Sequence, residues 1–119
     1  MPTDTPLLWF NPNCSNARGA RQLLEERGVE VEILDYRRNP PSRHELEALV
    51  RKVGGPPGDL VRRDTRFADL EVDPATLDSV DAVVDLLVEH VELLERPVLE
   101  SGDRAVIGRP PERVLDLLD

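Results

Sequence analysis

The sequence predicts an α/β fold that starts as strand–helix–strand and ends as a β-hairpin followed by a helix, with a helical block in between. An apolar run at residues 7–10, a helical pattern and an alternating segment at 29–34 indicate the first part. Two short apolar segments on either side of residues 101–103 indicate the hairpin. From the strand–helix–strand start we expect a parallel sheet.

Length and charge restrict the class of protein. A chain of 119 residues is long enough for one domain with a core and too short for two, so we expect a single domain over residues 1–119. A net charge of −9 argues against nucleic acid as a partner. No apolar run approaches the ~20 residues that a membrane span needs, and no signal peptide is visible. One cysteine cannot form an internal disulfide, so we expect a cytoplasmic protein.

The first strand is expected at Leu7–Phe10, where four apolar residues follow one another, and a polar turn comes directly after it. The next apolar residues recur at one-face spacing and predict a helix over about Ser15–Arg27: Ala17, Ala20, Leu23 and Leu24. Gly28 is expected to end this helix as a left-handed cap. The alternation over Val29–Leu34 then predicts a half-buried second strand.

The middle of the chain predicts a helical insert over about residues 42–90. Ser42 and Glu45 form a capping box, and the helix that follows ends at residues 54–57. A short helix or turn is expected around Asp59–Arg63, and Phe67–Asp73 has no clear period. Asp73-Pro74 is typical of a helix start. The clearest amphipathic helix then carries five apolar residues at helical spacing: Val80, Val83, Val84, Leu87 and Val88.

The end of the chain predicts a hairpin and a final helix. Strands are expected at Pro97–Glu100 and Arg104–Ile107, joined by the turn at residues 101–103. Gly108-Arg109-Pro110-Pro111 is expected to open the last helix, whose apolar side carries Val114, Leu117 and Leu118. This order of elements matches a thioredoxin-like fold with a helical insert.

Cys14 is the candidate nucleophile. It lies in the turn between the first strand and helix, beside the positive end of that helix, where a thiolate is favoured. Polar neighbours argue against an inert core cysteine. A metal site is disfavoured because His44 and His90 lack paired spacing. Ala17 excludes a Cys-x-x-Cys dithiol and Ala20 excludes a Cys-x5-Arg phosphate loop.

Five motifs are spread over the chain from about Leu7 to Leu118. They are Asn11-Pro12-Asn13-Cys14-Ser15 with Arg18, Asn39-Pro40-Pro41-Ser42-Arg43, Leu60-Val61-Arg62-Arg63, Glu95-Arg96-Pro97 and Ile107-Gly108-Arg109-Pro110-Pro111-Glu112. In these motifs and in their order the chain resembles the arsenate reductases of the glutaredoxin-coupled type. The resemblance implies that Cys14 attacks arsenate and that Arg62, Arg96 and Arg109 hold the oxyanion. Guanidinium groups suit this role, because they offer permanently charged, bidentate donors and stabilise a thiolate.

The resemblance also implies the partners. A single cysteine cannot resolve its own adduct, so an outside thiol is needed, with glutathione or another small thiol followed by glutaredoxin as the expected donors. No bound metal, flavin or nucleotide is implied.

Supporting roles are expected for four further residues. Pro97 occupies the place where thioredoxin-like proteins carry a cis proline. Asn11 and Ser15 are expected to bond the sulfur or to cap the helix. Arg18 lies one turn into the helix and is expected either to add positive field at the site or to face solvent.

One departure from the family stands at Phe10, where relatives often carry a histidine that could stabilise the thiolate. We expect the helix start and the three arginines to compensate for it. Two other functions stay open at this stage. One is a thiol oxidoreductase acting on mixed disulfides, which needs Cys14 but not all three arginines. The other is a thioredoxin-like regulator that binds other proteins.

Overall fold

The computed structural model describes residues 5–118, which divide into two compact units. Residues 5–39 and 96–118 form the first unit, which carries the sheet, and residues 40–95 form the second. Within the described residues, no helix is both long and apolar enough to cross a membrane. The organisation as a single domain stays a prediction.

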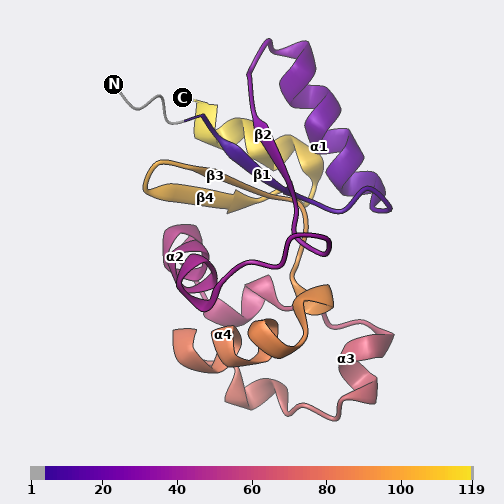
Figure 1. The fold of residues 1–119 in the computed structure, drawn as a ribbon, viewed down its shortest axis with the longest axis vertical. Coiled ribbons are helices and arrows are strands. Elements are labelled where there is room, and N and C mark those ends of the chain that lie inside the picture. Colours follow the sequence, from indigo (N-terminus) through magenta and orange to yellow (C-terminus); the bar gives the residue numbers. More distant parts are fainter. Residues whose placement is uncertain (1–4, 119) are drawn as a thin grey trace. The chain divides into compact units, whose positions relative to one another are not determined.

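The first unit is built on a four-stranded sheet in the order β2-β1-β3-β4 (Figure 1). The strands are β1 (Leu7–Phe10), β2 (Glu32–Asp35), β3 (Val98–Ser101) and β4 (Arg104–Ile107). β1 pairs in parallel with β2 and antiparallel with β3, which pairs antiparallel with β4. The predicted parallel start and the C-terminal hairpin are therefore confirmed.

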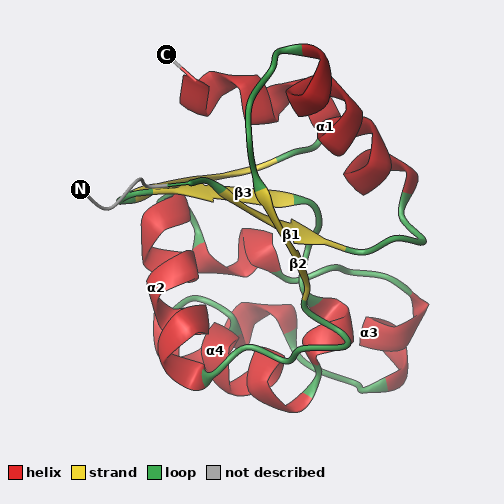
Figure 2. Cartoon of the chain, turned by 45° about the horizontal axis from the view of Figure 1, so that its top comes forward, coloured by secondary structure: helices red, strands yellow, loops and turns green. Residues whose placement is uncertain are grey.

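Two helices cover one face of this sheet, α1 (Ser15–Glu26) and the 3₁₀ helix η4 (Pro111–Leu118) (Figure 2). Alternate residues of β1 point to that face, as the pleat of a strand requires. The buried cluster there unites residues of α1, η4 and the sheet: Leu8, Phe10, Cys14, Ala17, Ala20, Leu24, Leu99 and Val114. This arrangement is the predicted thioredoxin-like one, and it puts the cysteine at the edge of the core.

The second unit is helical. Its elements are α2 (Arg43–Val53), η1 (Pro57–Leu60), α3 (Thr65–Asp69), η2 (Pro74–Thr76), α4 (Val80–Glu89) and η3 (Val91–Leu93). The predicted capping box is confirmed, since the Glu45 N–H donates to Ser42 Oγ at 3.1 Å and the Ser42 N–H donates to Glu45 Oε1 at 2.9 Å. α2 packs against α4, and Arg43 pairs with Asp85 at 2.6 Å across the two helices.

The second strand starts three residues later than the alternation predicts. Helix α1 ends at Glu26, and the N–H groups of Gly28 and Val29 donate to the Glu25 and Leu24 carbonyls at its end. Gly28 has φ +69°, the predicted left-handed cap. Because the helix terminus uses these backbone groups, sheet pairing begins at Glu32, whose N–H donates to the Pro6 carbonyl.

Two helix predictions in the second unit are also corrected. The short helix or turn expected around Asp59–Arg63 ends at Leu60. Two residues later, the Arg62 N–H donates to the Leu93 carbonyl at 2.7 Å and so no longer bonds within the turn. Asp73-Pro74 starts only the short η2, while α4 has its own cap, with Ser79 Oγ accepting from the Ala82 N–H at 3.1 Å. Val88, expected on the apolar face of that helix, is 48% exposed.

The last helix begins at Pro111, the final residue of the segment expected to open it, and Gly108 belongs to the base of the hairpin. Its N–H donates to the Pro97 carbonyl at 2.8 Å. A Cβ atom at Gly108 would lie 2.9 Å from both Pro97 Cγ and Val114 Cγ1, closer than side chains approach. The absent side chain therefore lets the hairpin base and η4 pack directly.

The close packing at Gly108 predicts that Gly108→Ala destabilises the protein by about 1–3 kcal/mol, the usual effect of overpacking. Gly19→Ala is the matched control. Its new Cβ would lie 3.4 Å from Pro111 Cγ, within ordinary contact, in a helix that favours alanine by up to about 1 kcal/mol. Urea unfolding of both variants measures the difference. Equal stability of the two would contradict the role given to Gly108.

Candidate active site

Cys14 is the N-cap residue of α1 and follows a turn fixed by its own polar groups. Its N–H donates to the Asn11 carbonyl at 3.0 Å, and the Asn13 N–H donates to Asn11 Oδ1 at 2.9 Å. Arg18 Nη1 donates to the Pro12 carbonyl at 2.8 Å and closes the turn from the helix side. These bonds hold the sulfur at the start of the helix, where Cys14 is 7% exposed.

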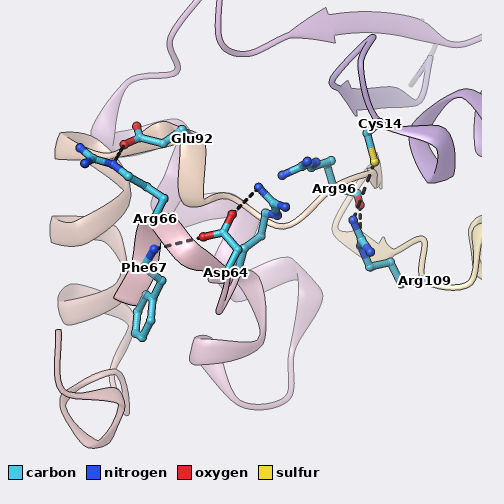
Figure 3. Close-up of polar contacts among 8 residues, drawn as sticks. Cys14, Asp64, Arg66, Phe67, Glu92, Arg96 and Arg109 are labelled. Atoms are coloured by element: carbon cyan, nitrogen blue, oxygen red, sulfur yellow. Dashed lines mark hydrogen bonds and ion pairs between the residues drawn. The ribbon is translucent and has the colours of Figure 1, made fainter. Parts of the chain in front are cut away.

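Two of the three predicted arginines lie at the base of the hairpin beside this sulfur (Figure 3). Arg109 Nη2 lies 3.8 Å from Cys14 Sγ, and Arg109 Nε donates to the Arg96 carbonyl at 2.9 Å. The planar guanidinium is thereby oriented by one bond and offers another edge to the sulfur. The Arg96–Pro97 peptide bond is cis, as the resemblance predicts, and the Arg109–Pro110 bond is cis as well.

The thiol of Cys14 is more acidic than an ordinary cysteine. Burial on its own raises the pKa, because the charged form loses water. The backbone N–H of Ala17, the Arg96 guanidinium and the backbone N–H of Asn16 act in the opposite direction and together hold the pKa of Cys14 below its ordinary value. The thiolate is the reactive form, so this environment favours nucleophilic chemistry.

The predicted supporting residues Asn11 and Ser15 do not cap the helix with their side chains, and Arg18 faces solvent, one of the two placements expected for it. The Asn11 side chain shapes the turn instead of capping α1, and no side chain makes a cap hydrogen bond at the start of α1 within the described residues. Ser15 is the first residue of the helix and is exposed. Arg18 is exposed and bonds to the turn. The first N–H groups of α1 thus remain directed at the sulfur, a feature already implied by the predicted helix start.

Arg62 belongs to the second unit, and its predicted role stays a prediction. Its Nη1 pairs with Asp64 Oδ2 at 2.9 Å. Asp64 Oδ1 accepts from the Phe67 N–H at 3.1 Å (Figure 3). The carboxylate that caps α3 therefore also orients this guanidinium.

Sequence reasoning missed the cation at Phe10. The guanidinium carbon of Arg21 lies 5.6 Å from the centroid of the Phe10 ring, within the range of a cation–π contact. Arg21 also pairs with Glu25 at 3.3 Å. A spacing of eleven residues between strand and helix carries no sequence signal for this contact.

Metal ligation is a separate question from thiol chemistry. Across residues 5–118, no group of three or more histidine, cysteine, aspartate or glutamate side chains is arranged to hold a metal ion. His90 Nδ1 lies 3.4 Å from Glu92 Oε2, which also pairs with Arg66 at 3.0 Å, so this histidine belongs to an ion-pair cluster of the second unit.

The environment of Cys14 predicts that Arg96→Ala and Arg109→Ala each raise the pKa of the thiol, because each removes a cation that stabilises the thiolate. The pH dependence of alkylation by iodoacetamide measures this pKa, and it reports on Cys14 alone because the chain has no other cysteine. Arg104→Ala, at the exposed far end of the hairpin, is the charge-matched control. A wild-type pKa near ~8.5, the ordinary value, would contradict the assignment.

A family model and individual relatives of known sequence point to the same family. The ArsC family matches residues 9–117. An arsenate reductase of Neisseria meningitidis serogroup A is 36% identical over 109 residues, which cover 90% of this chain and 92% of that protein. An arsenate reductase of Haemophilus influenzae is 36% identical over 116 residues, covering 94% of this chain and 97% of that protein.

Solved structures agree with the sequence relatives. The arsenate reductase from Vibrio cholerae superposes with a TM-score of 0.83 at 31% identity and covers 93% of this chain and 95% of its own. With a family match over most of its length and relatives of this similarity, the chain belongs to the ArsC family.

Proposed function

We propose that this chain is an arsenate reductase in which the Cys14 thiolate attacks the arsenic atom. One observation carries the proposal: the guanidinium of Arg109 is held between Cys14 Sγ and the Arg96 carbonyl, at the start of a helix whose N–H groups lower the thiol pKa. The names of the relatives from Neisseria, Haemophilus and Vibrio support it, since each is called an arsenate reductase.

Positive charge at this position suits an oxyanion substrate. The chain as a whole has a net charge of −9 and repels anions at long range, so an anion site needs local cations. Arg96 and Arg109 supply two guanidinium groups at the sulfur, whose forked donors match the oxygens of a tetrahedral oxyanion. The same cations that stabilise the thiolate would then hold its target in reach.

The proposed reaction starts with a bond from Cys14 Sγ to arsenic. One oxygen of arsenate takes up protons and leaves as water, which gives a thiol–arsenate adduct with arsenic still in its pentavalent state. Arsenic then gains two electrons and leaves as arsenite. Two external thiols supply these electrons and are joined as a disulfide, while Cys14 returns as the thiolate.

The external thiols are needed because the chain contains no second cysteine. We assign the first to glutathione or another small thiol and the last step to glutaredoxin, as the family resemblance implies. A free, acidic thiol that must stay reduced between turnovers fits the reducing cytoplasm.

The proposal predicts that arsenite formation from arsenate, with glutathione and glutaredoxin supplied, is abolished in Cys14→Ser and reduced about 100-fold in kcat/KM in Arg96→Ala, the scale for a lost charged donor. Arg104→Ala is the control and should turn over like the wild type. Arsenite is quantified directly by chromatography. A folded wild type without turnover, tested across several thiols, would contradict the proposal and favour the mixed-disulfide reductase.

The family resemblance further predicts that Arg62→Ala raises the KM for arsenate about tenfold, the effect of losing one charged contact of about 1.4 kcal/mol. Arg66→Ala is the matched control in the same unit, because Arg66 pairs with Glu92 and has no predicted substrate role. Initial rates against arsenate concentration separate KM from kcat. An unchanged KM in Arg62→Ala would remove this residue from the substrate site.

A further inference from the structure

A pocket of about 320 Å³ lies directly beside the cysteine turn. Its lining comes from the turn itself, from the last residue of β2 and from the segment that follows β2: Asn11, Pro12, Asn13, Asp35, Arg37 and Arg38. The volume is at the lower end of the range for small-molecule sites. All six residues belong to the first unit, which also holds Cys14.

The topology of the sheet explains why this pocket adjoins the site. β1 and β2 run parallel with Phe10 paired to Asp35, so the segments that follow them leave the sheet at the same edge (Figure 1). One segment carries Cys14 and the other carries Arg37 and Arg38. Ligands of open α/β sheets commonly bind outside the carboxyl ends of parallel strands.

The charges of this pocket are not used by the fold. Arg37 and Arg38 are both exposed, and within the described residues neither guanidinium makes an ion pair or a side-chain hydrogen bond. The backbone of Arg38 is held in place, because the Arg38 N–H donates to the Asp35 carbonyl at 3.1 Å. Two adjacent free guanidinium groups in a chain of net charge −9 are suited to a carboxylate.

A second pocket that Pro12 also lines provides the contrast. It measures about 580 Å³ and includes Arg18 and Arg21. These arginines are already engaged, Arg18 with the Pro12 carbonyl and Arg21 with Glu25 and the Phe10 ring. The larger pocket therefore offers less unsatisfied charge to a ligand.

The pocket after β2 carries charges of both signs, which limits the chemical classes of ligand that it can bind. Asp35 places a carboxylate among its walls, beside the two arginines. A multiply charged oxyanion would be repelled by this carboxylate. A molecule that carries both a carboxylate and an ammonium group matches both signs at once.

We propose that this pocket binds the thiol co-substrate and that the co-substrate is a small amino-acid-type thiol, whose carboxylate pairs with Arg37 and Arg38 and whose ammonium group faces Asp35. Binding there delivers the thiol to the turn that carries Cys14. The proposal rests on the proposed function only in taking an external thiol as the group that attacks the sulfur adduct.

The test uses thiol exchange at Cys14, which requires no arsenate. Cys14 is first converted to its mixed disulfide with 2-thiopyridine, a neutral leaving group. The thiolate of an added probe attacks Cys14 Sγ, the bond to the pyridyl sulfur breaks, and pyridine-2-thione leaves with the electron pair and takes up a proton. Its absorbance gives the rate constant, which is divided by that of the same probe on a free pyridyl disulfide to remove intrinsic reactivity.

The probes are glutathione, its dimethyl ester and N-acetylglutathione. The wild type should prefer glutathione over the ester about five- to tenfold, the effect of one or two partly exposed ion pairs. The double variant Arg37→Gln/Arg38→Gln should lose this preference. Acetylation of the amine should slow the wild type but not Asp35→Asn, which no longer attracts an ammonium group.

The control double variant is Arg27→Gln/Arg104→Gln, which removes the same charge from exposed positions outside the pocket. It should keep the full preference for glutathione. Equal corrected rate constants for glutathione and its dimethyl ester in the wild type would overturn the proposal. A preference for glutathione that survives in Arg37→Gln/Arg38→Gln would also overturn it. Equal loss of the preference in the control variant would do the same, because it would show that net charge alone causes the preference.

Failure of this proposal is distinguishable from failure of the proposed function. If arsenate is reduced and no preference for glutathione is found, only the thiol pocket is wrong. If the preference is found and arsenate is not reduced, the pocket stands and serves a mixed-disulfide reductase.

Discussion

A guanidinium group fixed between a carbonyl oxygen and a sulfur atom is the contact on which the chemistry of this chain depends. The base of the hairpin presents the Arg96 carbonyl to Arg109 Nε, and this bond orients the guanidinium toward Cys14. The hairpin is placed by its pairing with β1, and β1 leads directly into the cysteine turn. The sulfur therefore follows β1, the carbonyl precedes β3, which pairs with β1, and Arg109 follows β4, which pairs with β3.

The electrostatics follow from this arrangement. Burial makes ionisation of Cys14 harder, and the start of α1 together with the cations at the hairpin base reverses that effect. The reversal is local, because the chain carries 24 acidic and 15 basic side chains and its long-range field is negative. Phe10 cannot itself stabilise the thiolate, and the guanidinium of Arg21 lies over its ring.

Elements governed by neighbouring residues could be predicted from the sequence. The apolar run of β1, the capping box at Ser42 and the hairpin turn at Gly102 each depend on chemistry within a few residues, and the structure has all three. The start of β2 could not be predicted, because Val29 has the alternation of a strand but gives its N–H to the end of α1. Asp73-Pro74 likewise has a helix-start signal that a second cap at Ser79 limits to one short turn.

Less of the candidate site than of the fold could be predicted from neighbouring residues alone. Cys14 could be found from its turn and the helix that follows. Arg109 lies 95 residues away from it in sequence, so only the resemblance to a family singled it out among fourteen arginines. The contact of Arg21 with Phe10 and the pocket at Arg37 and Arg38 depend on how strand ends and helix faces meet in three dimensions, which residue spacing does not encode.

The glycine at the hairpin base links the acidity of the thiol to the local stability of the fold. Gly108 bonds to Pro97, and the next residue bonds to Arg96, so these two hydrogen bonds close the same end of one ladder. Opening that end would withdraw both guanidinium groups from the sulfur in a single cooperative event. The thiol of Cys14 would then lose its nearby cations together and keep only the helix start, so its acidity depends in part on how firmly this end of the ladder is closed.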